Sequence, residues 1–345
     1  MSLLSALTVT FALCLSNALA RYVLQDDYFE VDEHGAFFDK FRFWEDEDPT
    51  KGFVLYKNYG DCLEAGLISN TTVNVIMRAD SHNIAPFGRS SVRIESKKTY
   101  DHGLLVIDLD HMPGSICGVW PAFWSYGPSW PNDGEIDIIE GINQFRANRM
   151  SLHTGPGCYL KNRTTHFHAY SGEVLYTHCT PSNTSNTGCS IGSFDLTTYG
   201  DGFNAIGRGI YATEWTSKHI SIWFFPRHSI RKDVNGPLGR TPDPGTWGLP
   251  LSRFDLTCDI GMNFKNHSIV FDITFCGGWA GGKQWNTSIP VNSTWPPTHN
   301  QRNTSCAAKT GCTCEDWVRD HPEAFEEAYW SVNALRVYQD VKDEW

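Results

Sequence analysis

Three acidic residues, Glu135, Asp137 and Glu140, lie within the run Gly-Glu-Ile-Asp-Ile-Ile-Glu-Gly. Side chains alternate between the two faces of a β-strand, so Glu135 and Asp137 would share one face while the neighbouring isoleucines enter a core. Strict alternation would then bury Glu140 among aliphatic side chains, which strongly destabilises a charged carboxylate. A β-bulge at Ile138-Ile139 adds one residue to the strand and returns Glu140 to the face of the first two acids. We therefore predict a bulged strand that carries three carboxyl groups on one face.

The predicted spacing of these acids suits the cleavage of a glycosidic bond. With the bulge, Glu135 and Glu140 stand four effective steps apart, roughly 13 Å, and glutamate side chains that lean together would bring their carboxyl groups to about 5–6 Å. At that separation one carboxylate attacks an anomeric carbon while the other carboxyl group protonates the departing oxygen, whereas inversion needs more room. Because neighbouring negative charges disfavour one another, Asp137 would keep one glutamate ionised and the other protonated. The alternative interpretation is a solvent-facing acidic strand edge.

Aromatic residues are concentrated directly upstream of the acids. Trp120, Phe123, Trp124, Tyr126 and Trp130 lie close together, with prolines at positions 121, 128 and 131. Indole and phenol rings stack on the apolar faces of sugar rings, and a proline-rich segment cannot bury all five. We expect Trp124 and Trp130 to bind carbohydrate, and Phe123 with one tryptophan to pack in the core.

The elements that must position these residues are predicted to be strands. Short segments rich in β-branched and aromatic residues are separated by Gly, Pro, Asn and Asp, which is typical of an all-β sandwich or barrel. They are Val73–Met77, Ser91–Ile94, Leu104–Leu109, Glu135–Glu140, Ile220–Phe225, Ile269–Phe275 and Val332–Tyr338. Only Cys314 to Tyr329 has a helical pattern, of one or two short turns. Because the last predicted strand lies at the far C-terminus, we expect one domain closed by its terminal strand.

The first twenty residues carry no charged side chain and end in Ala18-Leu19-Ala20, the small-x-small pattern of a signal peptidase site. They predict a signal peptide over residues 1–20, with a buried N-terminal helix as the alternative. No other segment approaches the ~20 apolar residues that cross a bilayer, so we expect residues 21–345 to form one soluble domain without a membrane partner.

Cysteine and asparagine patterns both favour secretion. The chain has 11 cysteines, and loss of Cys14 with the signal peptide leaves an even number, as disulfide pairing requires. No Cys-x2-Cys pair occurs, which argues against a zinc site. Asn-x-Ser/Thr acceptors for N-glycans occur at Asn70, Asn162, Asn183, Asn266, Asn286, Asn292 and Asn303. We therefore expect a secreted, extracellular glycoprotein.

The charge balance argues against nucleic acid as a partner. The sequence has 28 basic and 39 acidic residues, a net charge of −11, and no long run of Lys or Arg. A phosphate-binding surface needs a concentration of basic residues. We expect no nucleic-acid partner, and we expect the chain to act as a monomer.

The acidic run is similar to the signature of glycoside hydrolase family 16 in its bulged form, Glu-x-Asp-x-x-Glu. Other segments resemble this family over nearly the whole mature chain: Tyr22-Val-Leu-Gln-Asp26, Val119-Trp-Pro-Ala-Phe-Trp124, Leu152-His-Thr-Gly155, Ile222-Trp-Phe-Phe-Pro-Arg227, Cys258-Asp-Ile-Gly261, Thr274-Phe-Cys-Gly-Gly-Trp-Ala-Gly281 and Leu335-Arg-Val-Tyr-Gln339. The ordered set resembles the secreted laminarinases of basidiomycete type, which are endo-1,3(4)-β-glucanases.

The resemblance implies a β-jelly-roll sandwich of two curved antiparallel sheets with a substrate groove across the concave face. It also implies retaining hydrolysis of β-1,3-glucan and mixed-linkage β-1,3-1,4-glucan, a polysaccharide partner and no required cofactor. A calcium ion is common on the convex face in this family, but this sequence does not define ligands for one, so we predict no metal site.

Roles for individual residues also follow from the resemblance. Glu135 matches the nucleophile, Glu140 the acid/base and Asp137 the assisting carboxylate. The residues expected to contact substrate are Trp120, Trp124, Trp130, His153, Glu214 and Trp279. Without the family context, a hydrogen-bonded structural histidine is the usual interpretation of His153. Glu214 could equally be a surface acid.

The chain departs from the family pattern at several positions. Trp215 follows Glu214 where relatives have Arg, which would add a stacking face or close part of the groove. Cys62 has no evident counterpart, and one of Cys306 and Cys312 is extra. We predict that the two extra cysteines pair with each other.

Two other functional classes use the same residues. A transglycosylase would transfer the sugar to a carbohydrate acceptor in preference to water, which product analysis at high oligosaccharide concentration would reveal. A non-catalytic β-glucan lectin would bind laminarin without a rise in reducing ends, but it would not need two positioned acids.

Overall fold

The computed structural model describes residues 21–71, 73–161, 169–182, 186–234, 241–288 and 304–341. The predicted signal peptide lies outside these residues, as do the acceptor asparagines Asn162, Asn183, Asn292 and Asn303. Within the described part of the chain, no helix is long and apolar enough to cross a membrane.

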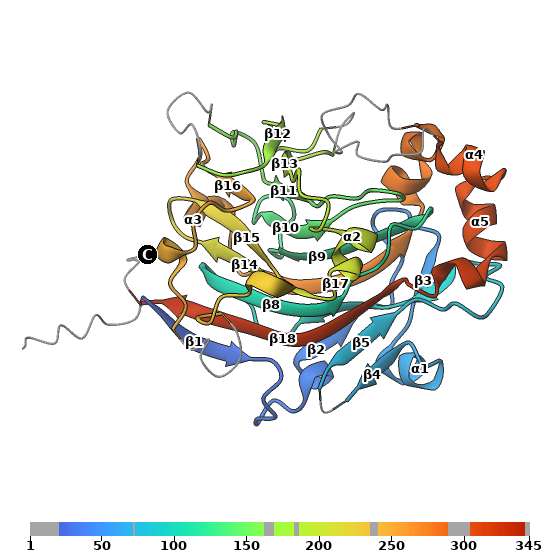
Figure 1. Ribbon diagram of the computed structural model, residues 1–345, viewed down its shortest axis with the longest axis horizontal. Coiled ribbons are helices and arrows are strands. Elements are labelled where there is room, and N and C mark those ends of the chain that lie inside the picture. The colour runs from blue at the N-terminus through green and yellow to red at the C-terminus, as the bar shows by residue number, and fades with distance from the viewer. Residues whose placement is uncertain are drawn as a thin grey trace, which may run out of the picture.

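Two eight-stranded antiparallel sheets are stacked on each other (Figure 1). The first, called sheet 1 below, has the strand order β12-β13-β11-β10-β9-β17-β7-β2. Its strands are β2 (Phe41–Phe43), β7 (Arg93–Ser96), β9 (Val119–Tyr126), β10 (Glu135–Glu140), β11 (Arg149–His153), β12 (Glu173–Tyr176), β13 (Cys189–Gly192) and β17 (Ser268–Phe275).

The second sheet, sheet 2, has the order β16-β15-β14-β8-β18-β5-β4, with β1 paired to β18. Its strands are β1 (Tyr22–Asp27), β4 (Ile68–Asn70), β5 (Val75–Arg78), β8 (Gly103–His111), β14 (Gly209–Trp215), β15 (Ile220–Pro226), β16 (Ser252–Phe254) and β18 (Tyr329–Asp340). A separate parallel pair joins β3 (Val54–Tyr56) to β6 (Arg89–Ser91). Each of the seven predicted segments overlaps a strand, and the all-β sandwich is confirmed.

The last strand of the chain lies inside sheet 2. β18 has 12 residues and pairs with β8 on one side and with β5 and β1 on the other. The first and the last described strands are therefore hydrogen-bonded to each other, as expected of a domain that its terminal strand closes.

The core lies between the sheets and follows the alternation of side chains along each strand. In β17, Ile269, Phe271 and Ile273 are at most 2% exposed and pack in the main hydrophobic cluster. The intervening Asp272 and Thr274 point to the opposite face of sheet 1. We call this opposite face, which also carries the three acids of β10, the site face.

The α-helices within the described residues are short, with four to seven residues each. They are α1 (Tyr59–Glu64), α2 (Gly200–Ala205), α3 (Ile260–Asn263), α4 (Cys306–Thr310) and α5 (Cys314–Asp320). Short non-α turns are η1 (Phe37–Lys40), η3 (Arg227–Ser229), η5 (Pro244–Thr246), η6 (Gly277–Gly281), η7 (Lys283–Asn286) and η8 (Pro322–Phe325). The helical prediction for 314–329 is confirmed as α5 followed by η8, after which β18 begins. The prediction that this is the only helical segment was wrong, because α1 to α4, of four to six residues each, are too short to show a helical period in the sequence.

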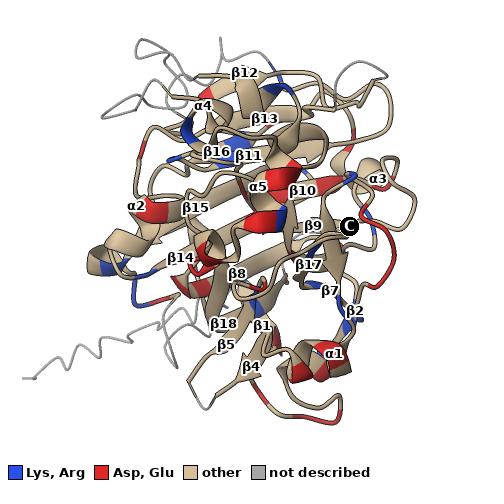
Figure 2. Cartoon of the chain, turned by 90° about the vertical axis from the view of Figure 1, so that its right-hand side faces the viewer, with Lys and Arg blue, Asp and Glu red and all other residues tan. Residues whose placement is uncertain are grey.

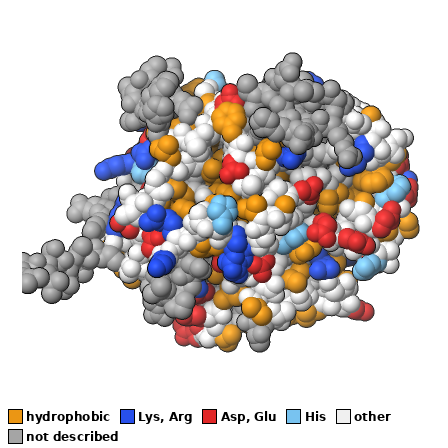
Figure 3. All heavy atoms as spheres, in the orientation of Figure 1, with side chains coloured by type: hydrophobic (Ala, Val, Ile, Leu, Met, Phe, Trp, Pro, Cys, Tyr) orange, Lys and Arg blue, Asp and Glu red, His pale blue; other side chains and the backbone are white. Residues whose placement is uncertain are grey.

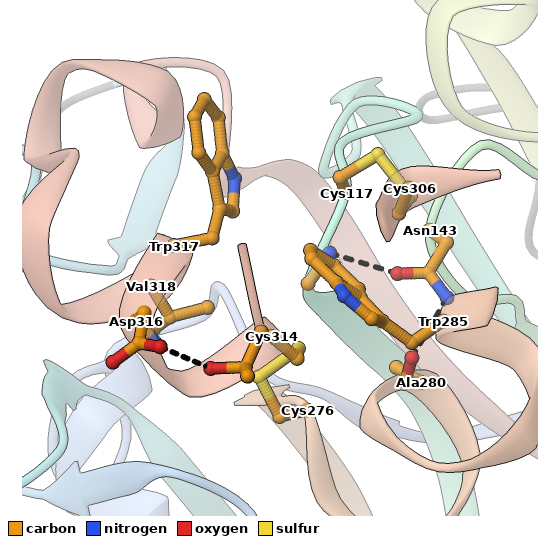
Figure 4. Close-up of a disulfide and its surroundings, with 12 residues drawn as sticks. Cys117, Asn143, Cys276, Ala280, Trp285, Cys306, Cys314, Asp316, Trp317 and Val318 are labelled. Carbon is orange, nitrogen blue, oxygen red and sulfur yellow. Dashed lines mark hydrogen bonds between the residues drawn. A yellow bond between two sulfur atoms is a disulfide. The ribbon is translucent and has the colours of Figure 1, made fainter. Parts of the chain in front are cut away.

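Eight cysteines form the disulfides Cys117–Cys306, Cys158–Cys258, Cys179–Cys189 and Cys276–Cys314. Figure 4 shows two of them beside Trp285 and Trp317. Cys62 and Cys312 are both free thiols, so the predicted bond between the two extra cysteines was wrong. The physical reason is their position: Cys62 is buried in α1 with its thiol 3.3 Å from the Lys57 carbonyl oxygen, whereas Cys312 lies between α4 and α5.

Charged side chains of both signs are mixed on the surface. On the face shown in Figure 3, Lys and Arg are scattered among acidic residues. Figure 2 shows acidic residues on α1, which carries Asp61 and Glu64, and on α5, which carries Glu315 and Asp316. This distribution agrees with the net charge of −11.

Candidate active site

The predicted bulge is present in β10. Asp137 pairs with Trp124 of β9, and Ile139 pairs with the next residue back, Phe123, so that Ile138 is the extra residue. All three isoleucines of the strand are at most 1% exposed and lie in the core. The acids Glu135, Asp137 and Glu140 consequently share the site face.

The neighbouring strands bring aromatic and imidazole side chains to the same face. β9 places Tyr126 opposite Glu135 and Trp124 opposite Asp137. β11 places His153 opposite Glu135 on the other side of β10. Directly opposed residues on one face of a sheet lie within contact distance, so the register alone assembles this cluster.

Each glutamate accepts a hydrogen bond from a different indole. Trp130 Nε1 donates to Glu135 Oε2 at 2.5 Å, and Trp120 Nε1 donates to Glu140 Oε1 at 3.0 Å. Two of the four tryptophans predicted to contact substrate, Trp120 and Trp130, therefore orient the carboxyl groups. Trp130 is 43% exposed, which leaves part of its ring available to a ligand.

His153 is buried and contacts two of the acids. Its Nε2 lies 3.4 Å from Asp137 Oδ2 and 3.6 Å from Glu135 Oε1. The exposed ring of Trp130 lies beside it, with 6.5 Å between ring centroids. The structure thus places His153 in the acid cluster, as the family resemblance implied.

The three carboxyl groups have different electrostatic surroundings. Burial, and then the charges of Glu135 and Glu140, raise the pKa of Asp137 well above its usual range. Burial also raises the pKa of Glu140, although the Arg149 charge and the hydrogen bond from Trp120 oppose this rise. A raised pKa is what a carboxyl group needs in order to hold a proton for donation near neutral pH.

Arg149 is a member of the site that the sequence did not reveal. It begins β11 and is 6% exposed, and its guanidinium lies over the Trp279 ring at 5.0 Å and over the Tyr176 ring at 5.3 Å. Burial lowers the pKa of Arg149, while the charge of Glu140 raises it. The sequence signal that could have identified Arg149 is its position at the start of the strand that follows the acidic motif.

Trp279 and Trp120 form one wall of the site. Their rings meet edge to face at 5.4 Å, and Phe145 packs against Trp279 at 5.8 Å. Trp279 belongs to η6, directly after β17, and is partly exposed. The structure therefore brings both predicted tryptophans to the Glu140 end of the acid row.

Trp124 lies in a second polar cluster on the site face. Its Nε1 donates to Asp272 Oδ1 at 2.7 Å, and its ring stacks on Tyr126 at 5.0 Å. The Tyr126 hydroxyl contacts Glu95, which accepts a hydrogen bond from Arg93 at 2.8 Å. These side chains extend the site face across β17 and β7.

Asp272 was also missed from the sequence. Burial raises its pKa to about 7, with the Arg93 charge and the Trp124 hydrogen bond opposing the rise. The sequence signal that could have identified Asp272 is its position as the single acid of a mainly apolar strand, between Phe271 and Ile273. Such an acid must point away from the core, and β17 pairs with β9 beside the acid row.

Glu214 is not at the site, and this prediction was wrong. It lies on β14 of sheet 2, on the same face as Ile210 and Ala212. Those two residues pack in a second hydrophobic cluster with Tyr22 and Trp223, whereas Tyr211 and Trp215 of the same strand pack in the main core. Glu214 therefore points outward from sheet 2, away from sheet 1.

Three donors hold the Glu214 carboxylate there. It accepts hydrogen bonds from the Tyr22 hydroxyl at 2.8 Å and from His219 Nε2 at 2.9 Å, and it pairs with Arg21 at 3.0 Å. Burial alone would raise the pKa of Glu214, but these partners hold it below its usual value.

Trp215 faces the interior between the sheets and so adds no stacking surface for a sugar. It is 7% exposed and packs on His267 at 4.7 Å. With Thr213, Ile136 and other residues it lines an interior cavity of about 30 Å³. Trp215 is therefore a core residue.

Glu135, Asp137 and His153 are also the described residues that could hold a metal ion, because their ligand atoms lie within 4.8 Å of one another. The cluster offers two carboxylates and one imidazole, a donor set that several divalent cations accept. His153 also contacts both acids of this cluster, and Glu135 accepts a hydrogen bond from the Trp130 N–H.

Two glutamates on one face of a bulged strand, lined by tryptophans on a β-sandwich, form an arrangement typical of glycoside hydrolases. The family model of the XgeA-like catalytic GH16 domain matches residues 41–338. The chain belongs to glycoside hydrolase family 16, as the sequence motifs predicted.

Fungal relatives agree with this assignment. The endo-1,3(4)-β-glucanase of Arthroderma benhamiae is 41% identical over 96% of this chain and 68% of its own length. The endo-1,3(4)-β-glucanase xgeA of Emericella nidulans is 36% identical over 94% of this chain. The chain spans only 48% of the Emericella protein.

Two solved structures share the fold closely. Laminarinase 16A from Phanerochaete chrysosporium has a TM-score of 0.78 and 35% identity, over 92% of this chain and 99% of that one, and it holds 6-O-glucosyl-laminaritriose in donor and acceptor sites. An elongating family 16 β-1,3-glucosyltransferase has a TM-score of 0.76 and 39% identity, over 92% of this chain and 100% of that one. The jelly-roll fold class is confirmed.

Proposed function

We propose that this chain is a retaining endo-β-glucanase that cleaves β-1,3-glucan and mixed-linkage β-1,3-1,4-glucan. The observation that carries the proposal is the bulged strand β10, which places Glu135 and Glu140 on one face. There each carboxyl group accepts a hydrogen bond from a different indole N–H. The named endo-1,3(4)-β-glucanases at 36–41% identity support the same substrate class.

In the first step Glu135, ionised, attacks C1 of a glucosyl unit as the bond from C1 to the departing oxygen breaks. Glu140 donates its proton to that oxygen, so the leaving chain departs as a neutral alcohol and a glycosyl ester forms on Glu135. The raised pKa of Glu140 suits this donor role because the group keeps its proton at higher pH than an exposed glutamate.

Asp137 keeps the two glutamates in different charge states. With its pKa well raised, Asp137 stays protonated beside Glu135 and does not add a third negative charge to the cluster. A neutral Asp137 can donate a hydrogen bond to the Glu135 carboxylate. His153 Nε2 lies 3.6 Å from Glu135 Oε1.

In the second step Glu140 acts as a base. It removes a proton from water, whose oxygen attacks C1 and breaks the ester to Glu135, so the β configuration of the substrate is retained. Glu140 thereby regains the proton that it gave away in the first step.

Reducing-end release from laminarin and lichenan tests the function. The native chain should release reducing ends, and the first anomer seen by NMR should be β. Glu135→Gln should remove nearly all turnover and keep laminarin binding, whereas the exposed control Glu315→Gln on α5 should leave turnover unchanged. An α anomer would contradict retention, and binding of laminarin without any release would indicate a lectin.

Transglycosylation is the second candidate, and a specific likeness favours it. The elongating β-1,3-glucosyltransferase is 39% identical and its fold matches this chain over all of its length. Both activities share the glycosyl ester and differ in whether water or a sugar hydroxyl attacks it. Products longer than the starting laminari-oligosaccharide, formed at high oligosaccharide concentration, would identify transfer as a main activity.

We also propose that the chain is a secreted, monomeric glycoprotein. Four disulfides support an oxidising compartment. Among the acceptor asparagines within the described residues, Asn70, Asn266 and Asn286 are exposed. Mass spectrometry of protein from the culture medium, before and after enzymatic removal of N-glycans, tests secretion and glycosylation, and size-exclusion chromatography tests the monomer.

A further inference from the structure

The bulge leaves one edge of β10 without a strand partner. β10 pairs with β9 from Glu135 to Glu140, but its pairing with β11 covers only Glu135 to Asp137. The next two residues, Ile138 and Ile139, are at most 1% exposed. Buried peptide N–H and C=O groups need hydrogen-bond partners, so this edge must be satisfied in another way.

The side chain of Asn148 supplies those partners. Its Nδ2 donates to the Ile138 carbonyl oxygen at 2.8 Å, and its Oδ1 accepts from the Glu140 N–H at 2.9 Å. A primary amide has one acceptor and donors in one plane, so it can replace a peptide group of a neighbouring strand. It therefore connects the bulge residue Ile138 to Glu140, across Ile139.

Asn148 is itself held at every polar group. Its backbone N–H donates to Thr198 Oγ1 at 3.1 Å, and its carbonyl oxygen accepts from the Ser193 N–H at 2.9 Å. The residue is fully buried and directly precedes β11. Because its backbone and its side chain are both hydrogen-bonded, Asn148 couples the position of the start of β11 to the position of the Glu140 backbone.

We propose that Asn148 is the positioning residue for Glu140, and that it aligns this glutamate for proton donation to the departing oxygen. The proposal rests on the proposed function. The hydrogen bonds of the Asn148 side chain go to the backbone of Ile138 and Glu140 and not to an acid side chain. The Glu140 carboxyl group is oriented by Trp120, whose Nε1 lies 3.0 Å from Glu140 Oε1. Glu135 is held by the β9 and β11 ladders and does not depend on Asn148.

This division predicts a dependence on the leaving group. A glucan chain leaves as a poor alkoxide unless Glu140 protonates it, whereas 2,4-dinitrophenolate leaves without a proton. Displacement of Glu140 should therefore slow the cleavage of laminarin but not the cleavage of a 2,4-dinitrophenyl β-laminarioside. Loss of Glu135 or of folding would slow both.

The principal test is Asn148→Ala, with kcat/KM measured on both substrates because this ratio reports the first chemical step. General acid catalysis contributes about 10²–10⁴-fold, and a misplacement of about 1 Å can cost 10²-fold. We expect kcat/KM for laminarin to fall roughly ten- to hundredfold, mainly through kcat, and kcat/KM for the dinitrophenyl substrate to fall less than about threefold.

Asn148→Asp provides a second variant that can rescue the contact. A protonated aspartic acid can donate to the Ile138 carbonyl oxygen and accept from the Glu140 N–H, as asparagine does, but an ionised one cannot donate. The titratable groups around this position are Glu140, Arg149, Tyr199 and Tyr211, and burial raises the pKa of both tyrosines. Laminarin cleavage by Asn148→Asp should therefore approach the native value at acid pH and fall below it as pH rises.

Asn143→Asp is the matched control. Asn143 lies in the same loop between β10 and β11, and its side chain likewise accepts one backbone N–H, from Gly118 at 2.8 Å, and donates to one carbonyl, of Ala280 at 3.0 Å. It makes no contact with β10 through these bonds. Its substitution should lower stability to a similar degree without a difference between the two substrates.

The outcomes separate the two proposals. If the native chain cleaves neither substrate, the proposed function fails. If the native chain cleaves both, but Asn148→Ala slows both equally or slows neither, Asn148 does not position the acid. If Asn148→Ala does not fold, the pH profile of Asn148→Asp decides: a laminarin profile parallel to that of Asn143→Asp overturns the inference.

Discussion

At the scale of single residues, the pKa of Glu140 depends on burial and on four neighbours, which shift it in opposite directions. Burial, the largest effect, raises its pKa, and so does the nearby Glu135. The Arg149 charge, the Trp120 hydrogen bond and His153 lower it. The pH range in which the group can donate a proton is therefore set by contacts that single substitutions can remove.

Trp120→Phe tests one of these contacts. The indole N–H stabilises the charged form of Glu140, so its removal raises the pKa of this group. A hydrogen bond to a charged group contributes about 1.5 kcal/mol, which corresponds to roughly one pH unit. The alkaline limb of kcat/KM on laminarin reports the acid in the free enzyme, and we expect it to move up by up to about one unit.

The control for this shift is Trp124→Phe. Trp124 also lies on the site face and also donates its N–H to a buried acid, but that acid is Asp272. Its loss can weaken substrate binding and should leave the alkaline limb where it is in the native chain. An equal displacement of the limb in both variants would contradict the assignment of Glu140 as the group that this limb reports.

The acid row was predictable from local alternation, and Glu214 shows where such reasoning stops. A strand pattern tells which residues share a face, so Glu135, Asp137 and the bulge could be derived. The same pattern groups Glu214 with Ile210 and Ala212 but does not say which side of the sandwich they cover. Partners at a distance of 192 residues in the sequence, such as Tyr22, settle that question.

At the scale of elements, Glu214 ties three strands of sheet 2 together. The carboxylate on β14 binds Tyr22 of β1, and Arg21 next to it binds both Glu214 and Asp340 of β18. These contacts are far from the acid row, on the outward side of sheet 2. The cluster therefore serves to attach the first described strand rather than to bind a sugar.

Glu214→Gln should lower stability and leave kcat on laminarin unchanged. The variant loses charge-assisted bonds, which contribute about 1.5–3 kcal/mol each, and keeps part of the hydrogen bonding through its amide. We expect a loss of about 1–3 kcal/mol in the free energy of unfolding at pH 7, measured by urea denaturation. A large fall in kcat with unchanged stability would return Glu214 to the active site.

The same variant predicts a pH dependence. The folded-state pKa of Glu214 lies below its ordinary value of 4.5, so the contribution of this group is present above that pH and is lost as pH falls through the folded pKa. The difference in stability between the native chain and Glu214→Gln should therefore shrink as pH falls below 4.5. A difference that grew on acidification would show that Glu214 is not held as a carboxylate.

The long strands were predictable and the short ones were not. β8, β17 and β18 have between 8 and 12 residues and enough β-branched and aromatic content to show a pattern. β2, β3, β4 and β16 have three residues each, too few for any period. These short strands form because a neighbouring strand offers backbone hydrogen bonds. That neighbour is distant in the sequence or set by the tertiary fold, so a local pattern does not reveal it.

At the scale of the whole molecule, two disulfides attach the C-terminal helices to the ends of site strands. Cys117, just before β9, is bonded to Cys306 at the start of α4, and Cys276, just after β17, is bonded to Cys314 at the start of α5. Figure 4 shows how these bonds bracket Trp285, whose Nε1 donates to the Cys312 carbonyl oxygen at 3.0 Å. The segment that holds Cys312 is thereby anchored beside η7, which contains Trp285.

That anchoring keeps the two free thiols apart and predicts how they react. α1, with Cys62, and the turn between α4 and α5, with Cys312, are separated in both views of the molecule (Figures 1 and 2). Burial raises the pKa of Cys62 to about 12, so this thiol is protonated and shielded at pH 8, whereas Cys312 is partly exposed. Thiol titration of the unreduced chain lacking residues 1–20 should therefore find one reactive group in the native state and two after denaturation. Cys312→Ser should abolish the first and Cys62→Ala only the second, and a peptide map that joined Cys62 to Cys312 would overturn this arrangement.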